Sequence, residues 1–477
     1  MHAPKEANFN IFENESFRDH LSTVQADGKR KWIFPVKPKG KWFNKRATVA
    51  VLYYALFFTL PFIFVNGRPL FLFNFPEGKF ILFGFAFWPQ DFFVFGLIML
   101  AGILFIVIFT NAFGRIFCGW ICPQTIFMEM LFRRVDYLVL GDAKKQRYLA
   151  GKKMSGEKLR KYILRYAIYF LLSFIIANTF LSYIIGVDEL FKIITEPVTM
   201  HIAGFAAILA FTGIFFSVFA FLREQVCTNI CPYGRLQGVL LDKNSIVVAY
   251  DYNRGEPRAK FKKGNHDDVG DCIDCNQCVD VCPTGIDIRN GTQLECVNCT
   301  ACIDACNFIM EKVGRPQGLI RFDSENNIAD GVKFKFTTKL KAYSAVLTVL
   351  LVAIVGLLIT RKDVDGTLMR TSGMLYQERG QDSVSNLYNI KLTNKTMHNI
   401  SLNIKPEGIN GTIQLVGKPV IEIRPEEQVA ATFFLVMPRK EMEHRKQKIK
   451  IGLYQQNEKV NTLSSTFLAP ISRTDDD

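Results

Sequence analysis

Five long apolar stretches constrain this chain more than any other feature of its sequence. A helix needs about 20 mostly apolar residues to cross a bilayer, because it rises only about 1.5 Å per residue. Apolar residues make up 49% of the sequence, with 43 phenylalanines, which is heavy for a soluble protein. Stretches of the required length run over 47–66, 92–113, 162–185, 201–222 and 342–360. The sequence therefore predicts a membrane α-helical bundle of about five transmembrane helices.

A sixth apolar segment, 69–88, is interrupted by the turn-forming sequence PEGK at 76–79. Its two halves are too short to span a bilayer. We expect an interfacial or re-entrant hairpin rich in phenylalanine.

Lysine and arginine counts predict the orientation of the bundle. The 46 residues before the first stretch hold ten and the loop 114–161 holds eleven, whereas 68–90 holds two and 187–200 one. Basic residues concentrate in cytoplasmic segments. We therefore expect the N-terminus and the segments 114–161 and 223–341 in the cytoplasm, and the residues after 360 outside. The net charge of +14 follows these flanks instead of forming one patch, so no nucleic-acid partner is expected.

Eight of the twelve cysteines form two runs of the pattern C-x-x-C-x-x-C-x-x-x-C, over 272–282 and 296–306. This is the spacing of bacterial ferredoxins with two [4Fe–4S] clusters, in which the fourth cysteine of each run binds the other cluster. The assignment is Cys272, Cys275, Cys278 and Cys306 for cluster 1, and Cys296, Cys299, Cys302 and Cys282 for cluster 2.

Other chemistries fit this pattern less well. C-x-x-C pairs also bind zinc, but eight cysteines in two runs of matched ferredoxin spacing favour clusters over two four-cysteine zinc sites. Disulfides are rare in the cytoplasm, where this segment is expected. Four aspartates lie next to the cysteines and are expected to lower the cluster potentials, namely Asp271, Asp274, Asp280 and Asp304.

Four further cysteines form two C-x-x-x-C-P motifs, Cys118 with Cys122 and Cys227 with Cys231, after the second and fourth apolar stretches. Residues four apart share one face of a helix, with Cβ atoms about 5–6 Å apart. Two adjacent spans would then bring four thiols together at the cytoplasmic face. Soft thiolates suit Cu(I), zinc or an iron–sulfur cluster. The spacing leaves these metals open, together with buried thiols that bind none.

The segment after residue 360 predicts a β-sandwich. Apolar and polar residues alternate in short runs separated by turn residues, which is typical of such domains. The predicted strands are 388–394, 400–405, 411–417, 420–425, 429–437 and 447–455. This segment contains no cysteine, so no disulfide is expected there.

Several motifs give the chain a specific resemblance. They are FPVKPKGKWFNKR (34–46), FCGWICPQ (117–124), VCTNICPYGRLQ (226–237), AYDYNRGEPR (249–258) and GLIRF (318–322), together with the double ferredoxin motif. The chain resembles the cytochrome c oxidase accessory proteins of the FixG/RdxA family, also called CcoG, over nearly its full length. The resemblance implies an immunoglobulin-like C-terminal domain and a multi-pass protein of the bacterial inner membrane.

The same resemblance implies a function. It suggests a membrane-bound polyferredoxin-type cupric reductase that reduces Cu(II) for assembly of the cbb3-type oxidase, with copper bound by Cys118, Cys122, Cys227 and Cys231. Expected partners are an unidentified electron donor, oxidase assembly factors or copper carriers, and a second copy of the chain. Two alternatives remain: a quinol-linked electron conduit to a periplasmic acceptor, and a non-redox copper-binding scaffold.

The predicted domains follow from these segments. They are a cytoplasmic basic leader (1–46), a four-helix membrane bundle with both C-x-x-x-C-P motifs (47–240), a cytoplasmic 2[4Fe–4S] ferredoxin-like domain (241–341), a fifth transmembrane helix (342–360) and a periplasmic immunoglobulin-like β-sandwich (361–477).

Overall fold

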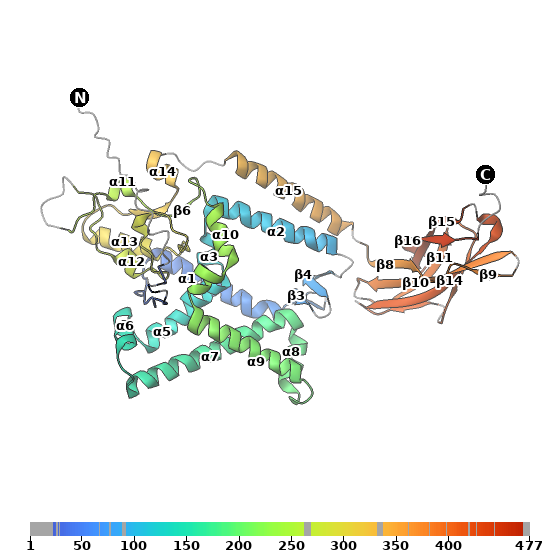
Figure 1. The fold of residues 1–477 in the computed structure, drawn as a ribbon, viewed down its shortest axis with the longest axis horizontal. Coiled ribbons are helices and arrows are strands. Elements are labelled where there is room, and N and C mark those ends of the chain that lie inside the picture. The colour runs from blue at the N-terminus through green and yellow to red at the C-terminus, as the bar shows by residue number, and fades with distance from the viewer. Residues whose placement is uncertain are drawn as a thin grey trace, which may run out of the picture. The chain divides into compact units, whose positions relative to one another are not determined.

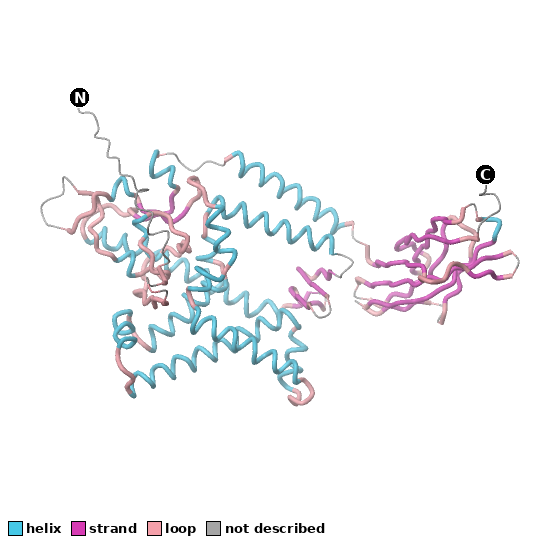
Figure 2. The backbone as a smooth tube through the Cα atoms, in the orientation of Figure 1, coloured by secondary structure: helices cyan, strands magenta, loops and turns pink. Residues whose placement is uncertain are grey.

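The computed structural model describes residues 22–470, except 25–26, 28, 66, 76–77, 88–91, 262–268, 332–336, 361, 381, 397, 418–419, 426 and 443. The chain divides into two compact units, Met1–Phe85 with Phe95–Leu351, and Ala86–Val94 with Val352–Asp477. The first unit contains all twelve cysteines and the second contains the β-sandwich (Figures 1 and 2).

Four helices among the described residues are long and apolar enough to cross a membrane. They are α2 (Phe92–Phe113), α7 (Gly156–Ile185), α9 (Ile202–Ser217) with the π-helical turn Val218–Leu222 that continues it, and α15 (Thr338–Ile359). Four of the five predicted spans are therefore confirmed. α7 begins where the Ser155 side chain accepts a hydrogen bond from the Lys158 N–H, and it ends at Gly186 with a positive φ of 88°.

The first predicted span differs, because α1 (Lys41–Thr59) begins inside the basic leader. The N–H groups of Trp42 and Phe43 donate to the Asp304 carboxylate at 3.1 and 2.7 Å. This carboxylate satisfies first-turn donors that would otherwise have no partner. The helix ends at Thr59, before a 3₁₀ turn (Leu60–Phe62), and its first turns contain Lys41, Lys45 and Arg46, so it is not apolar enough to be among the four membrane-crossing helices.

The phenylalanine-rich segment forms a β-hairpin, as expected. Strands β3 (Phe71–Asn74) and β4 (Lys79–Leu82) pair antiparallel, and Phe71 lies opposite Leu82. Three shorter strands accompany them, β1 (Phe64–Val65), β2 (Arg68–Pro69) and β5 (Phe85–Phe87).

In the sequence, the two cysteine runs lie between two short strands, β6 (Val247–Tyr250) and β7 (Ile320–Asp323), which pair antiparallel. Their loops carry α12 (Gln277–Asp280) and α13 (Ala301–Lys312). The shorter helices described in this unit are α3 (Ile116–Trp120), α4 (Pro123–Phe127), α5 (Arg133–Val139), α6 (Ala143–Gly151), α8 (Val187–Thr195), α10 (Pro232–Leu240), α11 (Tyr252–Gly255) and α14 (Glu325–Asp330).

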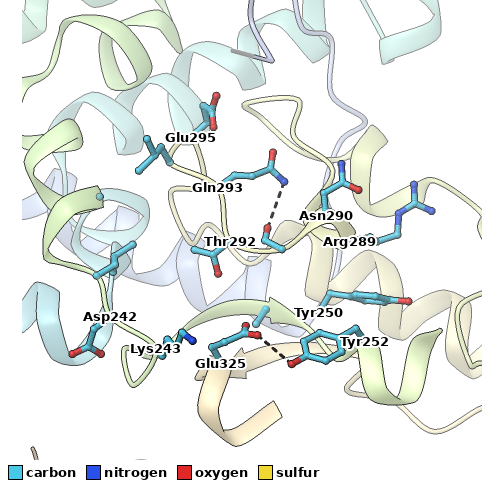
Figure 3. A pocket seen from close by; sticks show the side chains of 15 residues that line it. Asp242, Lys243, Tyr250, Tyr252, Arg289, Asn290, Thr292, Gln293, Glu295 and Glu325 are labelled. Carbon is cyan, nitrogen blue, oxygen red and sulfur yellow. Dashed lines mark hydrogen bonds between the residues drawn. The ribbon is translucent and has the colours of Figure 1, made fainter. Parts of the chain in front are cut away.

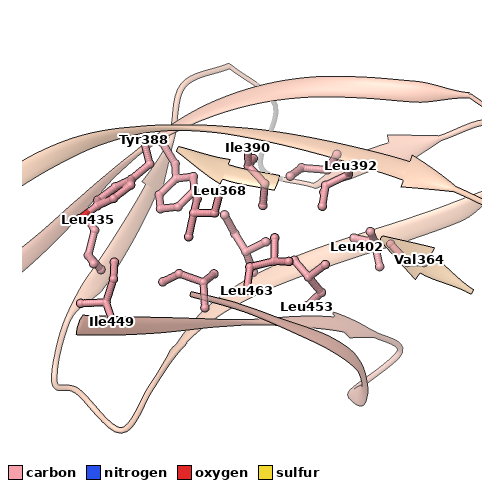
Figure 4. Close-up of a cluster of buried hydrophobic side chains, with 14 of the residues drawn as sticks. Val364, Leu368, Tyr388, Ile390, Leu392, Leu402, Leu435, Ile449, Leu453 and Leu463 are labelled. Carbon is pink, nitrogen blue, oxygen red and sulfur yellow. The ribbon is translucent and has the colours of Figure 1, made fainter. Parts of the chain in front are cut away.

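The second unit confirms the predicted β-sandwich. One sheet contains β8 (Val364–Arg370), β9 (Gln377–Arg379), β10 (Ser383–Asn394), β12 (Thr412–Leu415) and β14 (Gln428–Pro438). The other contains β11 (Ile400–Glu407), β13 (Ile421–Ile423), β15 (Lys446–Gln455) and β16 (Glu458–Leu468). Alternate residues of both sheets fill one core, including Tyr388, Ile390 and Ile449 (Figure 4). Strands β8, β9 and β16 were not predicted.

Candidate metal centres

The backbone of the two cysteine runs has matching unusual conformations. In the first run, Asp274 and Asn276 on either side of Cys275 have positive φ, at 50° and 59°. In the second run, Asn298 and Thr300 on either side of Cys299 have φ of 53° and 68°. Non-glycine residues seldom adopt this region, and clusters of such residues mark functional sites. Each run therefore winds in the same way around its own three cysteines.

The first run closes one cavity with the last cysteine of the second run. Cys272, Cys275, Cys278 and Cys306 all line this cavity, the four residues assigned to cluster 1. The other walls are mostly apolar, with Met310, Leu319 and Ile320 among them.

A second cavity brings together the cysteines assigned to cluster 2. Cys282, Cys296, Cys299 and Cys302 line it beside Ile286 and Ile288. Cys278 lines this cavity as well as the first, so the two cavities are neighbours.

The thiols in these cavities suit iron–sulfur clusters. All are free of disulfides, and burial raises the pKa of Cys278, Cys296 and Cys306 to about 12. Among the described residues, no three His, Cys, Asp or Glu side chains converge on a single metal ion. A cubane places its thiolates on separate irons, and the gathering of each quartet at its own cavity matches that arrangement.

The aspartates beside the cysteines are partnered, which offsets the lowering of potential expected from them. Asp271 pairs with Arg254, Asp274 with Arg289 and Asp280 with Arg147. Asp304 caps α1, as described above. Their negative charge near the clusters is therefore largely balanced.

The two C-x-x-x-C-P motifs match in their second halves but differ in their first, and neither is a continuous helix. Cys118 lies on α3 and Cys227 on a π-helical turn (Val226–Ile230). Cys122 and Cys231 are each the N-cap of the following helix, whose first residue is proline. The expected shared helix face is therefore wrong. A residue before proline avoids the α region, which breaks each helix between its two cysteines.

The fold nonetheless brings both motifs together. The pKa of Cys118 is raised to about 11, mainly by burial and further by the neighbouring Cys122 and Cys231 thiols. Burial also raises the pKa of Cys227 to about 12, with smaller contributions from Cys122 and Cys118. All four thiols are therefore electrostatic neighbours, as predicted.

Three polar residues around these thiols were not identified from the sequence. Gln237 Oε1 accepts from the Cys118 thiol at 2.9 Å and from Arg115 Nε at 3.1 Å. Arg46 Nε donates to the Gly119 carbonyl at 2.7 Å. Both arginines are buried. Burial raises the pKa of the cluster cysteines Cys299 and Cys296, and the positive charges partly oppose this rise: Arg46 lowers the pKa of Cys299 and Arg115 lowers that of Cys296. Arg115 lies shortly before the first motif and Gln237 shortly after the second. This position beside the cysteines was the sequence signal that could have identified them.

The first C-x-x-x-C-P motif also contacts the cluster 2 loop directly, through residues between its two cysteines. Trp120 Nε1 donates to the Asn298 carbonyl at 3.2 Å. Gly119 packs so closely on this loop that a Cβ there would lie 2.3 Å from the Val297 carbonyl oxygen. A small cavity beside Cys227 is lined by Thr284 and Val297, which also line the cluster 2 cavity. The cluster 2 cavity and the cavity beside Cys227 therefore share Thr284 and Val297 as a common wall.

Comparisons with known proteins agree with this architecture. Family models match for a 4Fe-4S dicluster domain (residues 222–325), a 4Fe-4S binding domain (93–145) and the IG-like fold at the C-terminal of FixG (354–470). The fold and the cysteine sites thus define a membrane-type iron–sulfur electron-transfer protein that holds two [4Fe–4S] clusters and ends in an immunoglobulin-like domain.

Relatives among curated proteins identify the family. The chain is 32% identical to protein RdxB of Cereibacter sphaeroides over 78% of this chain and 81% of that protein. It is 32% identical to RdxA of the same organism (70% and 72%), and 35% identical to the nitrogen fixation protein FixG of Rhizobium meliloti (63% and 59%). The chain belongs to the FixG/RdxA family.

Proposed function

We propose that this protein passes electrons through its two clusters to Cu(II) at Cys118, Cys122, Cys227 and Cys231 and releases Cu(I) for assembly of a cbb3-type oxidase. The observation that carries the proposal is the wall that the cluster 2 cavity shares with the cavity beside Cys227, one of the four neighbouring thiols. Each cluster carries one electron, and Cu(II) needs one electron to become Cu(I).

The cavities suggest an order of transfer. Cys278 lines both cluster cavities, and Val297 lines the cluster 2 cavity and the cavity beside Cys227. Electrons entering at cluster 1 would therefore reach cluster 2 and then the thiols. Cluster 1 is the distant member of this series.

The thiol environment supports a product that is Cu(I). Soft sulfur ligands prefer Cu(I) to Cu(II), and Met128 adds a thioether to the cavity beside Cys227. Because burial raises the pKa of Cys118 and Cys227, both thiols are protonated at neutral pH without metal. Copper binding must then release protons and draw the four sulfurs together.

The distribution of basic residues supports an orientation for this reaction. We propose that the clusters and the four thiols face the cytoplasm of the inner membrane, with the β-sandwich in the periplasm. Copper would then be reduced on the cytoplasmic side.

A second candidate is a further iron–sulfur centre at the paired thiols. It is favoured by the match of residues 93–145 to a 4Fe-4S binding domain, because this range includes Cys118 and Cys122. Anaerobic metal analysis separates the two: copper handling predicts iron for two four-iron clusters and added copper bound by sulfur, whereas a third centre predicts additional iron.

The proposed copper site is tested with the double variant Cys118→Ser and Cys122→Ser. We expect it to lose Cu(II) reduction while it keeps the absorbance of both clusters. Met128→Leu should weaken Cu(I) retention, and Met130→Leu is its matched control, because Met130 packs in a separate apolar cluster with Ala50 and Ile126. Unchanged Cu(II) reduction in the double cysteine variant would contradict the proposal.

A further inference from the structure

The first unit contains a cavity of about 520 Å³ that the mechanism above does not use. It lies between the end of α10, strand β6, the loop 289–295 and the start of α14. Figure 3 shows Tyr250, Tyr252 and Glu325 on one side and the Asn290–Glu295 loop on the other. Its lining combines apolar and aromatic side chains, which small-molecule sites use for contact area, with five charged residues, Asp242, Lys243, Arg289, Glu295 and Glu325.

Two residues connect this cavity to cluster 1. Tyr250 and Arg289 line both the large cavity and the cluster 1 cavity. The Tyr250 hydroxyl donates to Glu256 Oε1 at 3.1 Å, and the neighbouring Cys272 contributes to raising the pKa of Tyr250 after burial. Arg289 donates to Asp274 and Asn276, the residues that flank Cys275, at 2.6 Å each. A molecule in this cavity would be separated from cluster 1 by single side chains.

The cavity therefore lies beside cluster 1, the cluster at which electrons would enter in the proposed order of transfer. A cluster accepts one electron at a time, so it cannot take a hydride from a nicotinamide. A hydroquinone can give its two electrons singly. We propose that this cavity binds a planar two-electron, two-proton donor of the hydroquinone class, a dihydroflavin or a quinol. This donor would supply the electrons for the proposed copper reduction, on which this part of the inference rests.

The charged groups of the cavity suit this chemistry. The donor QH₂ becomes Q, two electrons and two protons; the electrons pass singly through clusters 1 and 2, and two Cu(II) become two Cu(I). Two carboxylates of the lining can take the protons, those of Glu295 and Glu325. Glu325 Oε1 accepts a hydrogen bond from the Tyr252 hydroxyl at 3.1 Å. Lys243, whose ammonium has no ion pair among the described residues, offers a cation to a phosphate of the donor, beside the carboxylates of Asp242, Glu295 and Glu325.

The test uses the full-length protein in detergent with both clusters, under anaerobic conditions. Binding of FMN and of decylubiquinone is titrated separately, and bleaching of the clusters is followed after addition of reduced FMN, decylubiquinol or NADH. Thr292→Trp places a large side chain from an exposed position of the lining. Lys243→Glu reverses the charge, and Lys260→Glu, exposed and outside the lining, is its matched control.

We expect one of the two compounds to bind and, when reduced, to bleach the clusters. The compound that does so shows whether the electron donor is a flavin or a quinol. Thr292→Trp should weaken its binding about tenfold or more and slow bleaching equally, in protein whose absorbance shows intact clusters. A flavin phosphate should be weakened by Lys243→Glu and not by Lys260→Glu. The proposal is overturned if neither compound binds, if NADH alone bleaches the clusters, or if Thr292→Trp bleaches as fast as the unchanged protein. If a donor bleaches the clusters but Cu(II) does not reoxidise them, the copper function fails and the donor site stands.

Discussion

Replacing Gly119 by alanine tests the close contact between the first thiol motif and the cluster 2 loop. A Cβ at this position would lie 2.3 Å from the Val297 carbonyl oxygen and 3.0 Å from that of Asn298. Because real Cβ atoms essentially never approach below 3.0 Å, α3 and the loop must separate by about 0.7 Å at that point.

The cost of this separation can be estimated. Overpacking of a tight contact costs about 1–3 kcal/mol, and alanine recovers about 0.5–1 kcal/mol in a helix. The net loss of about 0–2.5 kcal/mol corresponds to a fall in Tm of at most about 4 °C, because the unfolding entropy of a unit of this size is large. Since the backbone that moves lies between Cys296 and Cys299, cluster 2 should also change its EPR signal, and Cu(II) reduction should slow.

The assay is anaerobic thermal loss of the iron–sulfur absorbance in detergent, with EPR of the reduced protein. Gly102→Ala is the matched control, because it lies on α2 and its added Cβ meets nothing within 4 Å. If Gly119→Ala had the same Tm, EPR signal and copper reduction as Gly102→Ala, the contact inferred between α3 and the cluster 2 loop would be wrong.

Three further predictions concern stability. Asp136→Asn should cost about 3–5 kcal/mol, because the buried carboxylate pairs with Arg165 and Arg223 at 2.7 and 2.8 Å; Glu157→Gln, which breaks an exposed pair, should leave Tm unchanged. Burial alone would raise the pKa of Asp136, but the two arginines hold it below its ordinary value. The stabilisation that the Asp136 carboxylate provides is therefore complete above about pH 3.9 and is lost as the pH falls further. Acid should then lower the Tm of Asp136→Asn less than that of the unchanged protein. An equal dependence of Tm on acid in both proteins would refute the buried ion pairs as its cause. Tyr388→Phe should cost about 1 kcal/mol in the β-sandwich, because its buried hydroxyl donates to a β16 carbonyl at 2.9 Å, and an unchanged Tm would contradict this.

The apolar stretches and the alternating strands were predictable because each signal is local. Length and hydropathy locate α2, α7, α9 and α15. The start of α1 was not predictable, because it depends on Asp304, more than 250 residues away in sequence. Strand β16 was missed because serine and threonine occupy much of its length and weaken the apolar alternation.

The site was predictable to the same extent. Cysteine spacing indicates two quartets, and the structure gathers each quartet at one cavity. Pro123 and Pro232 predict that the helix ends or kinks at each motif, and a new helix does begin at each proline. The wall shared by the cluster 2 cavity and the cavity beside Cys227 could not be predicted, because Thr284, Val297 and Cys227 meet only in the tertiary fold.

The most direct test of the central claim follows the electrons themselves. Protein reduced with dithionite and then freed of it is mixed anaerobically with Cu(II), while EPR follows the clusters and a Cu(I)-specific chelator measures the product. The account predicts one Cu(I) for each cluster oxidised, and no such reaction when Cys118 and Cys122 are both serine. Clusters that stay reduced in the presence of Cu(II), or a serine variant that forms Cu(I) at the same rate, would contradict it.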